Sequence, residues 1–188
     1  MIPNKMTLGK LKEAVYLNAV RLFVDACTLF RTRSHASALA LAILSLEELG
    51  KLEMIDHICL DICCNGDGQH FLDQLFSRWM FLNHKNKQMW ATDLWSKSQK
   101  KRVREISDGR TDRAKQDAIY VGYSGRRVRC PKAVTRARAY AELTAVYDRF
   151  GDIRDCGFNG FHGCSDSRSS ARARRWLVKI EREYTGLE

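Results

Sequence analysis

The residues with the clearest chemical potential are an arginine and a histidine in the segment Arg78-Trp-Met-Phe-Leu-Asn-His84. A histidine can transfer a proton near neutral pH, and an arginine can stabilise the negative charge that develops on phosphorus. Together these side chains can break an RNA phosphodiester without a metal ion. A regular helix would place them about 120° apart. A bend, the long arginine side chain or a second subunit must therefore bring Arg78 and His84 to one atom.

A second group of charged residues, Glu47-Glu48-Leu-Gly-Lys51, ends the longest apolar segment of the chain. Glu47 and Lys51 are four residues apart, in the order that favours an ion pair on a helix. Alternatively, Glu47 or Glu48 could accept a hydrogen bond from the ring N–H of His84 and so orient the ring. They could also pair with basic residues of the following helix. Gly50, which lies between the two glutamates and Lys51, suggests that another helix approaches closely at this point.

The spacing of apolar residues predicts an all-α fold that positions these groups. The segment 35–63 is apolar nearly all round, as expected for the central helix of a bundle. We expect a helical bundle over residues 1–150, followed over 151–188 by a loop and a short basic C-terminal helix. The predicted helices are 8–30, 35–63, 71–95, 113–120, 131–150 and 169–184. The predicted loops are 65–68, 107–112, 123–127 and 151–170.

The formal net charge of +10 lies almost entirely in the second part of the chain, because the first 70 residues are close to neutral. Such a basic region suggests a polyanionic partner, of which nucleic acid is the commonest. A solvated basic surface would give the same composition. The candidate RNA contacts lie in the segments 97–104 and 126–138, and include Lys100, Lys101, Arg102, Arg126 and Arg127.

The seven cysteines form no disulfide framework, and the first residues lack the pattern of a secretory signal peptide. We therefore expect reduced thiols and a cytoplasmic protein. No glycine motif for a nucleotide cofactor occurs, and no apolar run is long enough to span a membrane. The sequence thus predicts a protein without a cofactor that makes no contact with a membrane.

The tail contains candidate metal ligands in Cys156, His162 and Cys164, to which Cys130 could add a fourth. Zinc sites usually contain two cysteines separated by two residues, and the tail has no such pair. We therefore predict no metal. A small zinc-supported domain in the tail stays an alternative, beside the two hypotheses on function given below.

Several stretches of the chain resemble the AbiV-type branch of the HEPN superfamily, which comprises small helical proteins of bacterial abortive infection against phage. The pairing of Glu-Glu-Leu-Gly-Lys51 with His84-x-x-Lys87 is the most specific. Lys115 stands where an arginine is usual, and Gly122 where an aspartate often follows. The matching stretches are Asn18 with Asp25-Ala26, Ala38-Leu-Ala-Leu-Ala-Ile-Leu-Ser-Leu-Glu-Glu-Leu-Gly-Lys51, His84-Lys-Asn-Lys87 and Lys115-Gln-Asp-Ala-Ile-Tyr-Val121.

HEPN proteins are commonly dimeric bundles, and many are metal-independent ribonucleases with an Arg-x4–6-His motif in a cleft at the dimer interface. The resemblance therefore implies that Arg78 and His84 form a catalytic pair. It also implies that two subunits supply the geometry that one helix cannot. In function, it implies a toxin-like role in anti-phage defence.

Two hypotheses follow. In the first, the protein is a homodimeric endoribonuclease. His84 acts as general base or acid for the attack of the ribose 2′-hydroxyl on the adjacent phosphate, and Arg78 stabilises the phosphorane. The product carries a 2′,3′-cyclic phosphate, and a phage-encoded activator or a cognate inhibitor controls the enzyme. In the second, the protein is a non-catalytic dimer that binds RNA, a nucleotide, or a phage or partner protein. The supporting or phosphate-binding residues of the first hypothesis are Glu47, Glu48, Lys51 and Lys87.

Overall fold

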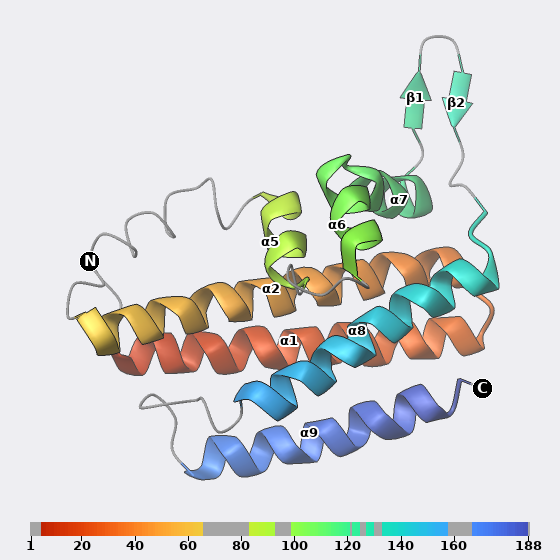
Figure 1. Cartoon of the computed structure of the whole chain (residues 1–188). Helices are drawn as coiled ribbons and strands as arrows, with labels where there is room; N and C mark the ends of the chain where they lie inside the picture. Colours follow the sequence, from red (N-terminus) through yellow and green to blue (C-terminus); the bar gives the residue numbers. More distant parts are fainter. Residues whose placement is uncertain are drawn as a thin grey trace.

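Two long antiparallel helices form the frame of the protein (Figure 1). The computed structural model describes residues 5–65, 83–92, 99–120, 122–124, 127–129, 133–157 and 167–187. Helix α1 (Lys5–Arg31) is joined to α2 (His35–Asn65) by a tight turn, in which Arg33 has a φ of 63°. The chain therefore reverses within residues 32–34 and brings the apolar faces of the two helices together.

Two further long helices pack beside this pair. Helix α8 (Arg136–Gly157) crosses α1 and α2, and α9 (Ser167–Thr185) lies against α1 and α8 (Figure 1). The ring of Tyr184 in α9 stacks on Tyr147 in α8, with 4.1 Å between the ring centroids. Arg31 of α1 holds the end of α9 through an ion pair with Glu183 at 2.8 Å.

Three short helices lie on the opposite side of α2 in Figure 1: α5 (His84–Trp90), α6 (Lys100–Ser107) and α7 (Arg110–Ile119). Gly109 lies between α6 and α7 with a φ of 68°, a conformation that favours glycine. Strands β1 (Gly122–Ser124) and β2 (Arg127–Arg129) pair antiparallel and project from the helices. The prediction of an all-α fold is confirmed. The small β-hairpin was not predicted.

The core is centred on α2, whose central position was predicted. Phe23 of α1 and Leu39, Ile43 and Leu46 of α2 are at most 1% exposed. Helices α1, α5, α7 and α8 all pack against α2, which explains why its sequence is apolar nearly all round. Among the described residues, no helix is both long and apolar enough to cross a membrane.

The helix predicted over 71–95 is wrong as one continuous element. Asn83 has extended backbone, with a ψ of 108°, and its side-chain oxygen accepts hydrogen bonds from the N–H groups of Lys85 and Asn86. Asparagine is a favoured N-cap because this bond satisfies backbone donors at the start of a helix. Helix α5 therefore begins at His84. Residues 66–82 lie outside the described part.

Other element boundaries also differ from the prediction. Helix α8 begins at Arg136 instead of at Pro131 and continues to Gly157, through residues predicted to be irregular. Helix α7 begins at Arg110, inside a predicted loop. The loop predicted over 123–127 includes residues of both hairpin strands. The division into a bundle over 1–150 and a separate tail stays a prediction.

Gly50 allows α2 and α5 to approach each other closely, as the sequence suggested. A Cβ atom at this position would lie 1.8 Å from the carbonyl oxygen of Lys87 and 3.2 Å from the backbone nitrogen of Ala91. Because those atoms belong to the backbone of α5 and its end, no side-chain rotation can relieve the overlap. A residue larger than glycine at position 50 would push α5 away from α2.

We predict that Gly50→Ala lowers the free energy of unfolding by about 2–3 kcal/mol, because the new methyl group overlaps the backbone of α5. Gly151→Ala is the matched control, since a Cβ there meets nothing within 4 Å in helix α8. Alanine favours helix over glycine, so the control should gain roughly 0.5–1 kcal/mol. Chemical denaturation of both variants measures this; equal stability of the two would contradict the close approach.

Candidate functional site

The centre of the candidate site is the carboxylate of Glu47, which α2 holds in the interior. The side chain of Glu47 is only 3% exposed. A buried carboxylate is stable only when it is paired and hydrogen-bonded. Residues from α5 and α7 supply these partners, so one charge links three helices that are distant in the sequence.

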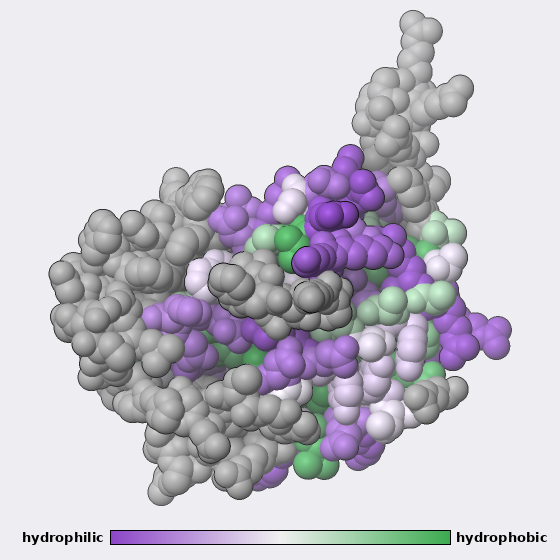
Figure 2. Space-filling model, viewed as in Figure 1, coloured by the Kyte–Doolittle hydropathy of each residue, from purple (hydrophilic) through white to green (hydrophobic). Residues whose placement is uncertain are grey.

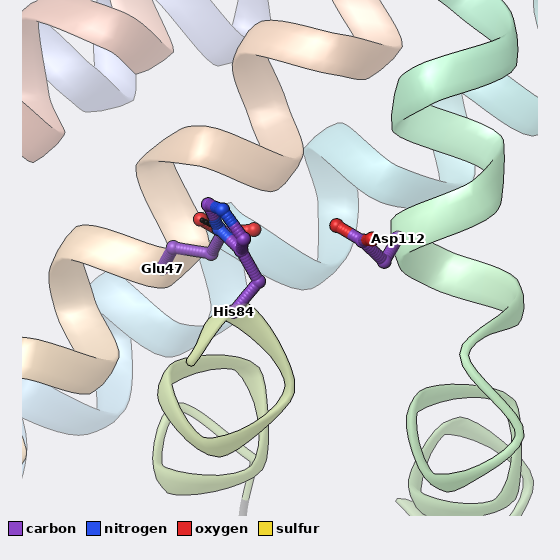
Figure 3. A group of neighbouring side chains, drawn as sticks. All are labelled: Glu47, His84 and Asp112. Atoms are coloured by element: carbon purple, nitrogen blue, oxygen red, sulfur yellow. Dashed lines mark hydrogen bonds and ion pairs between the residues drawn. The ribbon is translucent and has the colours of Figure 1, made fainter. Parts of the chain in front are cut away.

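His84, the first residue of α5, contacts this carboxylate through Nδ1, which lies 2.7 Å from Oε2 of Glu47 (Figure 3). Nδ1 also lies 3.2 Å from Lys115 Nζ, which can only donate, but Lys115 is already bound to Oε1 of Glu47 at the shorter distance of 2.6 Å. An ionised carboxylate can only accept a hydrogen bond, and its contact with Nδ1 is the shorter of the two, so we assign the proton to Nδ1. In the neutral ring, Nε2 then carries the lone pair. The described residues offer Nε2 no hydrogen-bond partner, and the histidine side chain is 46% exposed. One nitrogen is therefore fixed by the interior, and the other is available to a ligand.

Two lysines and a glutamine complete the surroundings of Glu47. Its Oε1 accepts hydrogen bonds from Lys115 Nζ at 2.6 Å and from Gln88 Nε2 at 2.8 Å, while Lys87 Nζ lies 3.7 Å from Oε2. Burial lowers the pKa of Lys87; Glu47 opposes this shift, and Lys51 adds to it. These lysines are at most 7% exposed, so they neutralise Glu47 and are poorly placed to meet a phosphate in solvent.

Asp112 of α7 points toward the same cluster (Figure 3). One ligand atom from each of Glu47, His84 and Asp112 lies within 4.8 Å of the others, a spacing that suits a metal ion. However, Lys115 Nζ lies 2.6 Å from Glu47 Oε1, 3.1 Å from Asp112 Oδ1 and 3.2 Å from His84 Nδ1. The ammonium group therefore occupies the place between these ligands, and a metal could enter only if Lys115 moved away.

The two glutamates have different roles. Lys51 pairs with Glu48 at 2.5 Å, so the expected Glu47–Lys51 pair is not formed. Of the two carboxylates proposed to orient His84, it is Glu47 that contacts it. The contribution of Lys115 was not predicted from the sequence, although its place in the stretch that resembles AbiV proteins could have indicated it.

The structure does not describe the second member of the predicted catalytic pair. Arg78 lies outside the described residues, as do Cys130, His162 and Cys164 and the side chain of Cys156, so the predictions for these residues stay open. Because α5 begins at His84, the angle of about 120° calculated for one regular helix does not apply to Arg78 and His84.

The predicted RNA contacts differ in their surroundings. Lys100 and Lys101 of α6 are exposed, whereas Arg102 is partly buried and pairs with Glu142 of α8. The side chains of Arg126 and Arg127 lie outside the described part. Figure 2 shows hydrophilic residues gathered where Figure 1 has α6 and α7. This surface could meet a polar partner.

Comparison with known proteins gives a family match. The family model of AbiV, a HEPN family, matches residues 7–151. No curated protein and no solved structure matches the chain. The matched range contains α2, α5, α6 and α7 and most of α1 and α8, and it ends before α9. It therefore includes Glu47, Arg78, His84 and Lys115.

We predict that Glu47→Gln lowers the free energy of unfolding by about 3–5 kcal/mol, because it leaves buried ammonium groups without their counter-charge. Glu48→Gln is the control and should cost about 1 kcal/mol or less, since its pair with Lys51 is nearer the surface. In a double-mutant cycle measured by denaturation, Glu47→Gln with Lys115→Met should cost less than the sum of the single variants. Strict additivity would show that the two groups are not coupled.

A further prediction concerns the ammonium of Lys115. Lys115→Ala should leave Glu47, His84 and Asp112 around an empty position and create a site for Zn²⁺ or Mn²⁺. The melting temperature of this variant should rise with added metal, while that of the unaltered protein should not. Lys115→Ala/Asp112→Asn is the control, which loses a ligand. A metal-dependent rise in the unaltered protein would mean that an ion displaces Lys115.

Proposed function

The chain belongs to the AbiV family of HEPN proteins, as its sequence predicted, and from this premise we propose that it is a metal-independent endoribonuclease of anti-phage defence. In this proposal His84 acts on the ribose 2′-hydroxyl that precedes the scissile phosphate. The protein would act as a toxin during abortive infection, under the control of a phage-encoded activator or a cognate inhibitor.

The observation that carries the proposal is the asymmetry of the His84 ring. Nδ1 is held by the buried carboxylate of Glu47, and Nε2 has no partner among the described residues. A catalytic base requires this arrangement, in which a third group fixes the ring and leaves the reacting nitrogen accessible. Glu47 is thus a positioning residue, and His84 is the proposed catalytic residue.

The proposed reaction needs no added cofactor. Nε2 of His84 removes the proton of the 2′-hydroxyl, and the resulting oxygen attacks the adjacent phosphorus. The P–O5′ bond breaks, and the His84 imidazole, protonated in the first step, returns a proton to the leaving 5′-oxygen. The product is a 2′,3′-cyclic phosphate. Arg78 is proposed to stabilise the charge on the phosphorane.

Lys87 receives a different role from the phosphate binding suggested by the sequence, and Lys115 shares this role. Lys87 and Lys115 both face Glu47 and are nearly inaccessible. We propose that they hold the carboxylate in place, so that the phosphate is bound by other cations, including Arg78. A homodimer, in which a second subunit brings its own arginine toward His84, is the assembly proposed for this purpose.

We predict that the purified protein cleaves RNA in excess EDTA and that His84→Ala lowers the cleavage rate roughly 10²- to 10⁴-fold, the usual contribution of a general acid or base. Arg78→Ala should cause a comparable loss. His57→Ala is the matched control, because His57 contacts Trp90 and not Glu47. Electrophoresis of a labelled RNA, with chemical identification of the 2′,3′-cyclic phosphate, provides the measurement.

Equal cleavage by the unaltered protein, His84→Ala and Arg78→Ala would remove both residues from the mechanism. RNA binding that weakens steeply with salt, is indifferent to His84→Ala and is accompanied by no cleavage would support the alternative function, a non-catalytic binding module. Loss of cleavage on chelation would contradict the metal-independent reaction.

A further inference from the structure

The ring nitrogen Nδ1 of His84 is approached by two side chains with opposite hydrogen-bonding requirements. Oε2 of Glu47, at 2.7 Å, can only accept a hydrogen bond, whereas Nζ of Lys115, at 3.2 Å, can only donate one. In a neutral ring, the bond to Glu47 requires the proton on Nδ1, and a bond from Lys115 would require it on Nε2. The two bonds exclude each other, so the competition between them determines the tautomer of His84.

The direction in which Lys115 donates its N–H groups is therefore decisive. An ammonium has three N–H donors. One is taken by Oε1 of Glu47 at 2.6 Å, a contact that is compatible with either tautomer. For the other donors, Oδ1 of Asp112 at 3.1 Å and Nδ1 of His84 at 3.2 Å lie at nearly equal distances. An attraction that draws the ammonium toward Asp112 thus draws it away from the ring.

Asp112 attracts this ammonium by its charge. The carboxylate points from α7 toward Glu47 and His84 (Figure 3). Its Oδ1 is buried, and none of the described residues donates a well-aligned hydrogen bond to it, so its contact with Lys115 is an ion pair. Asp112 and Lys115 are three positions apart on α7, which is the spacing of neighbours on a helix. The helix itself therefore holds the carboxylate beside the ammonium.

The charges around Nδ1 balance only when Asp112 is counted. Glu47 and Asp112 carry two negative charges, and Lys87 and Lys115 carry two positive charges. Without the charge of Asp112, the two lysines share the single carboxylate of Glu47. The next acceptor in contact with the Lys115 ammonium is then Nδ1 of His84. A bond to it would move the ring proton to the exposed Nε2.

We propose that Asp112 is a positioning residue that selects the tautomer of His84 with its proton on Nδ1. Its carboxylate draws the ammonium of Lys115 away from the ring and leaves Nδ1 to donate to Glu47. Nε2 then keeps its lone pair. The selection of the tautomer does not depend on RNA cleavage, whereas its consequence for catalysis rests on the proposed function.

Nitrogen NMR of the full chain labelled at histidine measures the ratio of the two His84 tautomers without RNA. The samples contain EDTA, and each spectrum is recorded at a pH where the ring is neutral. Asp112→Asn keeps the shape of the side chain and removes its charge. A charged partner forms a stronger hydrogen bond than a neutral one, so the ratio of Nδ1–H to Nε2–H should fall about threefold or more. Asp112→Glu, which keeps the charge, should stay closer to the unaltered protein.

Asp108→Asn is the matched control. Asp108 precedes α7, is exposed and pairs with Arg110 at 3.2 Å, so this variant should change the ratio by less than about 1.5-fold. Asp112→Ser also lacks the charge and should shift the ratio in the same direction as Asp112→Asn. Circular dichroism of each variant checks that it has folded. Equal ratios in Asp112→Asn, Asp112→Ser and Asp108→Asn would overturn the proposal.

Removal of the competing donor distinguishes this role from a purely structural one. Asp112→Asn/Lys115→Met should return the ratio to that of the unaltered protein or above it, because the Lys115 donor is then absent and Glu47 keeps its contact with Nδ1. A structural role predicts the opposite, since two changes in one cluster would disturb the ring more than one. A ratio as low as that of Asp112→Asn would contradict the proposal.

RNA cleavage measures the consequence for catalysis. The kcat of Asp112→Asn should fall by the factor by which the fraction of the Nδ1–H tautomer falls. Its KM should stay within about twofold, because Asp112 is proposed to make no contact with substrate. A loss of kcat with an unchanged tautomer ratio would overturn the proposal. If the ratio shifts as expected while the unaltered protein cleaves no RNA, the selection of the tautomer is confirmed and the proposed ribonuclease activity fails.

Discussion

The arrangement of this protein depends on one buried negative charge. Glu47 lies at the centre of the apolar helix α2, where an unpaired carboxylate would be strongly destabilising. His84 and Lys87 of α5 and Lys115 of α7 gather around it, and Gly50, one turn later, lets α5 approach closely enough to do so. The charge of Glu47 therefore helps to fix the positions of α5 and α7, and the position of α5 determines which nitrogen of His84 faces outward.

This interaction connects stability with chemistry. The same carboxylate that neutralises the buried lysines also orients the imidazole, so the ring is held without another residue dedicated to that purpose. Lys115 fills the position that a metal would take among Glu47, His84 and Asp112. A fixed ammonium can balance charge but cannot activate water as a metal does. The geometry therefore favours acid–base chemistry by the histidine.

Local patterns in the sequence predicted much of this fold, because they reflect forces that act within one helix. The apolar periodicity gave the two long helices and the central place of α2, and Gly50 indicated a close approach. The Glu47–Lys51 pair was wrong because the rule of four-residue spacing describes exposed helices, whereas a buried carboxylate takes partners from other helices. The break at Asn83 and the role of Lys115 depend on contacts between segments far apart in the chain, which periodicity does not encode.

The central claim, that Glu47 holds the proton of the His84 ring on Nδ1, can be measured by nitrogen NMR of the protein labelled at histidine. His84→Ala assigns the signals, and the spectrum is recorded at a pH where the ring is neutral. We expect a proton on Nδ1 and none on Nε2, and an increased fraction of the other tautomer in Glu47→Gln. A proton on Nε2 in the unaltered protein would contradict the account, because the exposed nitrogen could then not act as a base.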